Sequence, residues 1–263
     1  MKRVVFITGV SAGIGLAVAK AFLASGDTVY GVSRRSFDYP GLCHICADVT
    51  CEAEIKAAVA EVIGKEKRID ILVNNAGMGI SGSVENTPAE QMQKIFAVNN
   101  FGAVFALQAV IPIMREIGGG TIISIASVAS VIPVPFQSFY VATKSSLLML
   151  SDSLRMELKP FNIKVCSILP GDVKTDFTAA REKNPTDDAA YGERIHKSVA
   201  VMEKDEQNGL SPNEIAKKAL RLSYKKNPPP RTVVGKKYQL VVVLAKFLPI
   251  RVVYYLIDKL YAF

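Results

Sequence analysis

A tyrosine and a lysine that could exchange a proton with a substrate lie four residues apart in SFYVATK, residues 138–144. Residues at i and i+4 share one face of a helix, so Tyr140 and Lys144 are predicted to lie side by side. A free phenol has a pKa of about 10, and a neighbouring ammonium lowers it by stabilising the phenolate. The pair therefore predicts a general acid or base. Ser127, at the end of an apolar run, could hydrogen-bond a substrate oxygen.

A second chemical motif is the glycine-rich turn TGVSAGIG, residues 8–15, between a predicted strand and a predicted helix. Glycines let the backbone turn sharply and let a pyrophosphate approach the helix N-terminus, where free N–H groups favour anions. The spacing is G-x-x-x-G-x-G rather than G-x-G-x-x-G. A tight turn without a ligand is the alternative, but three glycines within residues 9–15 favour a dinucleotide site.

The end of the second predicted strand, VSRR, bears on cofactor choice. An acidic residue there would bind the ribose 2′-hydroxyl of NAD, whereas Ser33, Arg34 and Arg35 occupy the position and an arginine can pair with a 2′-phosphate. This pattern favours NADP(H). NAD(H) stays open because Asp38 is close in sequence, and a solvated arginine pair is the alternative.

Short β-branched runs alternate with helical patterns along the chain, which predicts a parallel sheet covered on both faces. We expect a single α/β domain over residues 1–263, a doubly wound (Rossmann) parallel sheet with strand order 3-2-1-4-5-6. The predicted strands are 3–9, 28–33, 43–49, 70–77, 120–127 and 163–171, and the predicted helices are 13–26, 52–66, 88–116, 140–159 and 210–222.

Several polar residues then fall at the carboxyl edge of this sheet, where open α/β sheets bind ligands. Asp48, the run Asn74–Gly77 and Ser127 each end a predicted strand. Asn99 lies inside a predicted helix, which is unfavourable unless its amide has a partner.

Taken in order, TGVSAGIG, NNAG, Asn99, Ser127, Tyr140-xxx-Lys144 and Pro170-Gly171 resemble the pattern of the short-chain dehydrogenase/reductase family, from residue 3 to about residue 176. The resemblance is to members that act on steroids, retinoids or other lipid carbonyls. It implies a catalytic tetrad of Asn99, Ser127, Tyr140 and Lys144, in which Asn99 holds a water of the proton relay.

The resemblance also implies a cofactor site. Asp48 is expected near the adenine, Asn75 and Gly77 near the adenosine ribose, Ile14 under the phosphates, and Val173 and Thr175 against the nicotinamide amide. Because the turn holds Val10-Ser11-Ala12 where many members have a basic residue, cofactor preference rests on Arg34 and Arg35. The full predicted set is Gly9, Ser11, Gly13, Ile14, Gly15, Ser33, Arg34, Arg35, Asp48, Val49, Asn75, Ala76, Gly77, Tyr140, Lys144, Pro170, Gly171, Val173 and Thr175.

The predicted substrate residues are Ser127, Tyr140, Phe136 and Phe177, in apolar surroundings that suit a small hydrophobic carbonyl or alcohol. A polar insertion at about residues 177–210 is expected to form a lid or binding loop. Two rival functions are 3-oxoacyl thioester reduction and a non-catalytic NADP(H) sensor. The presence of Ser127, Tyr140 and Lys144 together argues against the sensor.

The chain of 263 residues has a net charge of +8, and the charge is concentrated near its end. Residues 215–263 hold eleven Lys and Arg against Asp258 alone, so they carry +10 and the first 214 residues carry −2. No nucleic-acid motif accompanies the basic residues, which excludes that class and leaves an anionic lipid surface or plain solvation.

The start MKRVVFITG does not resemble a signal peptide, and four cysteines suggest a reducing compartment. We therefore expect a cytoplasmic protein that can associate with a membrane. Cys43 and Cys46 have the spacing of a metal or redox pair, but the stretch reads as a buried strand, so plain core cysteines and no metal are expected.

The apolar, basic C-terminal segment, about residues 231–263, is interrupted by charged residues and Pro249, so it has no apolar span of about 18 residues. It is expected either to pack over the pocket mouth or a dimer partner, or to form a cationic interfacial anchor. In both cases it would direct the pocket toward lipid-borne substrate. Long helices after strands four and five also make a homodimer the expected assembly.

Overall fold

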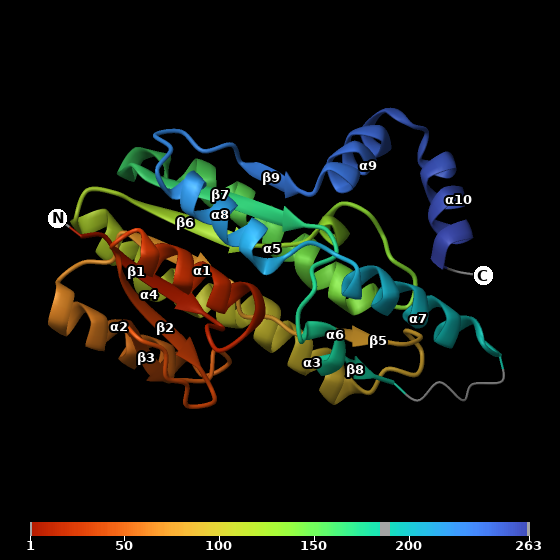
Figure 1. The fold of residues 1–263 in the computed structure, drawn as a ribbon, viewed down its shortest axis with the longest axis horizontal. Helices are drawn as coiled ribbons and strands as arrows, with labels where there is room; N and C mark the ends of the chain where they lie inside the picture. The colour runs from red at the N-terminus through yellow and green to blue at the C-terminus, as the bar shows by residue number, and fades with distance from the viewer. Residues whose placement is uncertain (1, 185–189, 262–263) are drawn as a thin grey trace.

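The computed structural model describes residues 2–184 and 190–261 (Figure 1). A seven-stranded parallel sheet forms the middle layer, in the order β3-β2-β1-β4-β6-β7-β9. Its strands are β1 (Val4–Thr8), β2 (Thr28–Ser33), β3 (Leu42–Cys46), β4 (Ile71–Asn74), β6 (Gly120–Ile125), β7 (Ile163–Pro170) and β9 (Arg231–Val234). The predicted fold class and the order of the first six main strands are confirmed.

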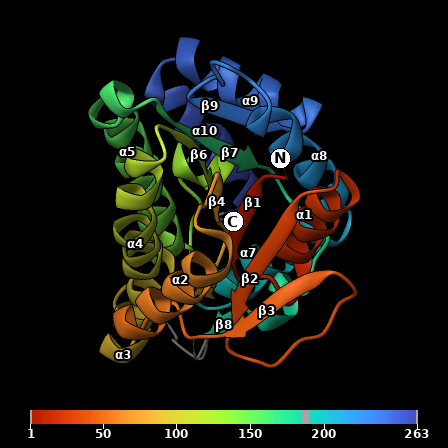
Figure 2. The same ribbon diagram turned by 90° about the vertical axis from the view of Figure 1, so that its left-hand side faces the viewer.

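Helices cover both faces of the sheet, so its central strands are buried along their whole length (Figure 2). Helices α1 (Gly13–Ala24) and α8 (Pro212–Ser223) lie on one face. Helices α2 (Glu52–Glu66), α4 (Gly102–Glu116) and α5 (Ser138–Glu157) lie on the other. This two-sided burial explains why the strands are continuous apolar runs.

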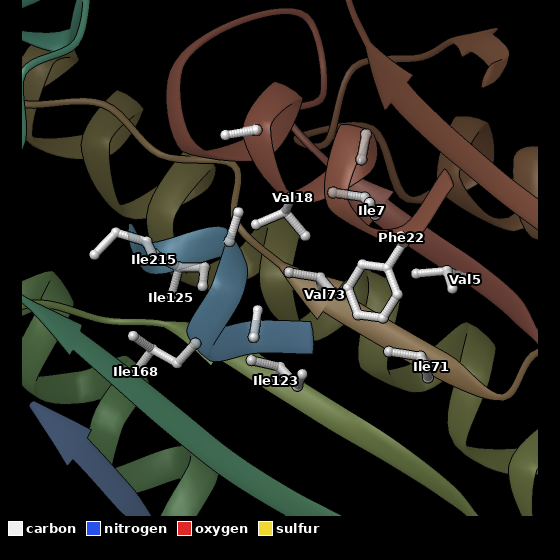
Figure 3. Packing of buried hydrophobic residues seen from close by; sticks show 14 of the residues in the cluster. Val5, Ile7, Val18, Phe22, Ile71, Val73, Ile123, Ile125, Ile168 and Ile215 are labelled. Carbon is white, nitrogen blue, oxygen red and sulfur yellow. The ribbon is translucent and has the colours of Figure 1, made fainter. Parts of the chain in front are cut away.

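The core between α1, α8 and the sheet is shown in Figure 3. Val18 and Phe22 of α1 and Ile215 of α8 pack against strand residues such as Ile7 and Ile123. At the start of α8, the Ser211 side chain accepts a backbone N–H in a capping box with Glu214.

The predicted long helix at 88–116 forms as α3 (Ala89–Phe96), a π-helical turn (Ala97–Phe101) and α4. Within the π turn the Gly102 N–H donates to the Ala97 carbonyl, five residues back, and π turns of this kind are frequent at functional sites. Among the described residues, 89–116 is the one helix with the length and composition to cross a membrane. It packs against α2 and α5, as a helix of a protein core does.

The predicted insertion at 177–210 lies at the carboxyl end of the sheet (Figure 1). It contains α6 (Phe177–Ala180), the short strand β8 (Glu182–Lys183) and α7 (Arg194–Gln207), and its residues 185–189 lie outside the described ones. Strand β8 pairs with β5 (Ile80–Ser81), which ties the insertion to the segment after β4.

One element was not predicted from the sequence, and one expectation is wrong. The segment at 231–263 begins with β9, the seventh strand of the sheet, before α9 (Lys236–Phe247) and α10 (Ile250–Tyr261). The four residues of β9 directly follow a run of prolines, and they are too few to give a recognisable strand pattern in the sequence. Cys43 and Cys46 are exposed rather than core residues, because β3 is an edge strand.

Candidate active site

The residues that the sequence singles out for chemistry meet at the carboxyl edge of the sheet, between β6, β7 and the start of α5. Ser127 follows β6 and begins a short 3-10 helix, where its Oγ accepts the N–H of Ala129 at 3.1 Å. Ser130 Oγ accepts the Ser127 N–H at 3.2 Å in return. This capping box holds the Ser127 hydroxyl in one orientation.

Tyr140 lies in the first turn of α5, half-buried, and shares a hydrogen bond with Ser127. Burial raises the pKa of the Tyr140 phenol to about 12, while the Ser127 hydrogen bond acts in the opposite direction. In this structure the net shift of the Tyr140 pKa is therefore upward, opposite to the lowering expected from the sequence. Desolvation of the phenolate is the larger effect.

Lys144 lies one turn further along α5 and is only 5% exposed. Its Nζ donates to the Ile125 carbonyl at 3.0 Å and lies 5.9 Å from the centre of the Tyr140 ring. Burial lowers the pKa of Lys144 to about 8, because no carboxylate compensates the lost hydration. Tyr140 and Lys144 are thus neighbours, as predicted, but a backbone carbonyl holds the ammonium.

Asn99 sits in the π turn, fully buried, and its amide is occupied by protein groups. Its Oδ1 accepts the Met78 N–H at 2.8 Å, and its Nδ2 donates to the Met78 carbonyl and to Thr143 Oγ1, both at 3.0 Å. Thr143 in turn donates to the Tyr140 carbonyl at 2.8 Å. The Asn99 side chain therefore joins the segment after β4 to α5. Met78 and Thr143 are the hydrogen-bond partners that an asparagine inside a helix requires.

The glycine turn has the features that a dinucleotide phosphate needs. Gly9 and Gly13 have φ of +71° and +54°, and a Cβ on Gly15 would lie 2.1 Å from the Gly9 carbonyl oxygen. No side chain caps the N-terminus of α1 at Ala12, so the N–H groups of Gly13, Ile14 and neighbouring residues face the carboxyl edge. The chain therefore fits a nicotinamide dinucleotide at this position.

Arg34 and Arg35 are exposed just beyond β2 and form no salt bridge within the described residues. Their backbones are fixed, because Ser33 Oγ donates to the Arg35 carbonyl at 3.0 Å and Cys46 Sγ to the Arg34 carbonyl at 3.1 Å. Ser33 Oγ also lies 2.7 Å from His44 Nε2. Ser33 therefore shapes the loop, and the two guanidinium groups remain available to a ligand.

The residues expected at the adenosine end have local structural partners. Asp48 Oδ1 accepts the N–H and hydroxyl of Thr50, at 2.9 and 2.8 Å. Asn75 Nδ2 donates to the carbonyls of Thr8 and Gly9, at 2.9 and 3.0 Å, which ties the end of β4 to the glycine turn. Ala76 shares this link through its N–H to Thr8 Oγ1 at 3.1 Å, and Val49 is buried in the core.

Gly77 lies beside the catalytic candidates, because a Cβ there would be 3.3 Å from both Asn99 Oδ1 and Lys144 Nζ. Thr175 lies beside the glycine turn, where its Cγ2 would be 3.4 Å from a Cβ on Gly13. Val173 is buried and bridges to Leu210. Pro170 ends β7, and Gly171 faces the C-terminal segment, where a Cβ would lie 2.0 Å from the Tyr238 ring.

Of the predicted substrate residues, Phe177 lies next to the phenol, with 5.7 Å between its ring centre and that of Tyr140. Phe136 lies further out, stacks edge-on against Tyr191 at 5.9 Å, and has a φ of +59°. A bulky residue in the left-handed region is strained, which is a feature of ligand-contacting loops.

Two further residues here were missed in the sequence. Arg181 is buried beneath Phe177, where its guanidinium carbon lies 5.8 Å from the ring centre, and it pairs with Glu206 of α7. Both residues lie in a polar, weakly helical stretch whose sequence pattern does not indicate that they pair. Their contact joins positions 25 residues apart, so no local pattern could predict it.

Comparison with known proteins agrees with this geometry. A family model described as short chain dehydrogenase matches residues 3–186. The 3-ketodihydrosphingosine reductase of Bacteroides thetaiotaomicron is 35% identical, over 99% of this chain and 98% of its own. The NADPH-dependent 3-dehydrocapnine reductase of Ornithobacterium rhinotracheale is 31% identical, over 98% and 96%. The crystal structure of a short-chain dehydrogenase from Streptomyces avermitilis superposes with a TM-score of 0.86 at 31% identity, covering 94% of this chain and 93% of that one.

The chain therefore belongs to the short-chain dehydrogenase/reductase family, as the motif order predicted. It has the fold of a nicotinamide-dependent oxidoreductase, and several of its relatives act as reductases of lipid-related compounds.

Proposed function

We propose that this protein is an NADPH-dependent reductase that converts the ketone of a long-chain, lipid-like substrate to a secondary alcohol. The observation that carries the proposal is the arrangement of Ser127, Tyr140 and Lys144 at the carboxyl edge, beside an uncapped helix N-terminus. The two full-length reductases with lipid-related substrates support the substrate class.

When bound, the cofactor supplies the hydride that reduces the carbonyl carbon. The chain's own groups act on the oxygen: the Ser127 hydroxyl, held by its capping box, hydrogen-bonds that oxygen, and the Tyr140 hydroxyl donates the proton. Lys144, held by the Ile125 carbonyl, orients the ribose and stabilises the phenolate that Tyr140 becomes. Asn99 acts as a positioning residue, because it fixes the backbone next to Tyr140 through Thr143.

The raised pKa of Tyr140 keeps the phenol in the protonated form that reduction requires. A phenol with a pKa of about 12 stays protonated near pH 7, and an alkoxide is far more basic, so the proton transfer to it is downhill. The reverse reaction would need the phenolate, which is scarce under these conditions.

Cofactor preference is assigned to NADPH through Arg34 and Arg35, which are exposed and lack salt-bridge partners in the described chain. The double variant Arg34→Ala/Arg35→Ala should raise the KM for NADPH about tenfold and leave the KM for NADH unchanged, because only NADPH carries the 2′-phosphate. Arg115→Ala, at a remote exposed arginine, is the matched control. Equal changes for both cofactors would contradict the assignment.

The function is tested by following NADPH oxidation with a long-chain 3-keto amino alcohol, a steroid ketone and an acetoacetyl thioester. We expect the long-chain ketone to be reduced best, and Tyr140→Phe to lower kcat/KM about 10³-fold. Unchanged turnover in Tyr140→Phe would overturn the mechanism. Faster reduction of the thioester would favour the acyl-thioester alternative, and NADPH binding without turnover of any substrate would favour a sensor.

We also propose that the C-terminal helices bring the protein to an anionic lipid surface. Helices α9 and α10 expose a row of apolar side chains, and Phe247 is 82% exposed. Exposed lysines and arginines flank this row. An apolar face bordered by cations fits anionic lipid better than a second copy of the same basic face. The apolar residues are Leu240, Val241, Val243, Leu244, Phe247, Ile250, Val252, Leu256 and Leu260, and the cations are Lys236, Lys237, Lys246, Arg251 and Lys259.

Surface substitutions test this better than truncation after residue 230, because truncation would remove β9 from the sheet. Leu240→Ser/Phe247→Ser should weaken binding to phosphatidylglycerol vesicles about tenfold, measured by co-sedimentation. Met156→Ser, at an exposed residue of α5, should change nothing. Equal binding of the wild type to neutral phosphatidylcholine vesicles, or no binding to either, would contradict the proposal.

The homodimer expected from the sequence stays a prediction. Exposed apolar residues on the α4 and α5 side, namely Phe101, Met149 and Met156, mark the face where a second copy would pack. Sedimentation equilibrium measures the assembly directly.

A further inference from the structure

The Arg181–Glu206 pair is a buried charge pair with unused hydrogen-bonding capacity. The Arg181 side chain is 1% exposed, and its Nη2 donates to Glu206 Oε1. Within residues 2–184 and 190–261, its Nε and Nη1 have no hydrogen-bond partner. Buried guanidinium N–H groups without a partner are costly, so their presence calls for a partner that the described residues do not provide.

The pair is one aromatic ring away from the proposed proton donor. The Arg181 guanidinium lies against Phe177, and Phe177 lies against Tyr140. The segment after β4 contributes Gly79, where a Cβ would lie 2.9 Å from the Phe177 ring and 3.6 Å from Arg181 Nε. A side chain at position 79 would therefore clash with the Phe177 ring, so the glycine allows the segment after β4 to pack closely against both side chains.

The surroundings of the pair define what it can bind. Thr178 Oγ1 donates to Glu206 Oε2 at 2.6 Å, and the neighbouring carboxylates of Asp172 and Asp205 accept the hydroxyls of Tyr238 and Tyr261. Burial also raises the pKa of Asp172. Because Glu206 neutralises Arg181 and two more carboxyl groups lie near, a second anion is disfavoured here.

An open pocket of about 610 Å³ is lined by residues of the 174–183 segment and α7, among them Thr178, whose hydroxyl donates to Glu206. Thr178 is thus the side chain past which a polar group of a substrate would reach the pair from this pocket, while the reacting carbonyl lies at Tyr140.

We propose that Arg181 and Glu206 form a head-group subsite that binds a hydroxyl group, with or without an adjacent amine, close to the reacting ketone. The free N–H groups of Arg181 donate to the hydroxyl oxygen, and Glu206 accepts from the hydroxyl or ammonium hydrogen. This subsite rests on the proposed function for its substrate class, and it adds a specificity determinant to it: the enzyme distinguishes a polar-headed lipid ketone from a plain one.

The subsite is tested with two pairs of compounds of equal chain length. Calorimetry measures the binding of a long-chain 2-amino-1,3-diol and of a plain secondary alcohol to the NADP⁺ complex. Steady-state kinetics gives kcat and KM for the corresponding amino ketone and plain ketone. The variants are Arg181→Met, Glu206→Gln and the double variant, which removes both charges together and so avoids a lone buried charge. Arg231→Met, at an arginine of β9 paired with Asp152, is the matched control.

The wild type and Arg231→Met should bind the amino diol at least about tenfold more tightly than the plain alcohol. Arg181→Met and the double variant should lose this preference through KM and Kd, with kcat and all values for the plain compounds unchanged. If the preference survives in both variants, or if both compounds are weakened equally, the subsite is overturned. Reduction of the plain ketone by the wild type would still leave the proposed function standing in that case, whereas failure to bind or reduce any of these compounds would overturn both proposals.

Discussion

The two halves of the site differ in how their polar groups are used. In the half that holds Ser127, Asn99 and Lys144, each of these side chains has protein partners that hold it in place. In the half that holds Phe177 and Arg181, two nitrogens of a buried guanidinium, Nε and Nη1, have no hydrogen-bond partner among the described residues. The difference indicates that the first half is organised for a chemical step and the second for recognition of a variable ligand.

Substitution in the first half should abolish turnover for every substrate. Lys144→Met removes the ammonium that stabilises the phenolate form of Tyr140, so kcat should fall about 10³-fold for polar-headed and plain ketones alike. Steady-state NADPH oxidation measures the loss. A loss confined to one substrate would show that Lys144 belongs to recognition and would break the comparison.

The same variant should be more stable than the wild type near pH 7. Burial lowers the pKa of Lys144 from 10.5 to about 8, which corresponds to a cost of about 3 kcal/mol for keeping the charged form in the folded protein. Loss of the hydrogen bond to the Ile125 carbonyl in the variant cancels about 1 kcal/mol of the gain from removing that cost. We therefore expect a gain of about 2 kcal/mol in the free energy of unfolding, measured by urea denaturation.

This gain should shrink as the pH rises. Between pH 8 and 10.5 the unfolded wild type keeps the Lys144 proton that the folded protein releases, so the stability contributed by this residue rises with pH. Denaturation near pH 7 and near pH 10 measures the change. A gain that is constant across this range would mean that the variant acts through packing instead.

Substitution in the second half should change binding rather than chemistry. Phe177→Ala removes the ring that separates Tyr140 from Arg181 and should raise the KM for long-chain ketones about tenfold, with kcat little changed. Phe161→Ala, at an exposed phenylalanine on the opposite edge, is the control. A fall in kcat alone would place Phe177 with the catalytic half.

The smallest expected effect concerns the hydrogen bond from Asn99, in the π turn, to Thr143, in α5. Thr143→Val leaves Asn99 with one partner fewer and should lower the free energy of unfolding by about 1 kcal/mol. Thr143→Ser keeps the hydroxyl and should restore most of that stability. If Ser and Val behave alike in thermal denaturation, packing of the methyl group and not the hydrogen bond holds the two segments together.

Much of the fold and of the first half could be predicted because the signals are local. Apolar runs, the glycine turn and the spacing of Tyr140 and Lys144 each lie within a few residues, and parallel strands bring their carboxyl ends to one edge. The wrong prediction for the cysteines and the unpredicted strand share one cause, which is dependence on distant neighbours. Cys43 is exposed on β3, the edge strand of the sheet, and β9 forms because it pairs with β7.

By itself the sequence determined the doubly wound sheet, the strand order and the residues that gather at its carboxyl edge, since periodicity and turn chemistry are properties of short segments. Only the tertiary structure decided the electrostatics. It raises the pKa of Tyr140 instead of lowering it, and it buries Arg181 against Glu206. Desolvation and pairing depend on which groups surround a side chain in space, and residues far apart in the chain supply those groups.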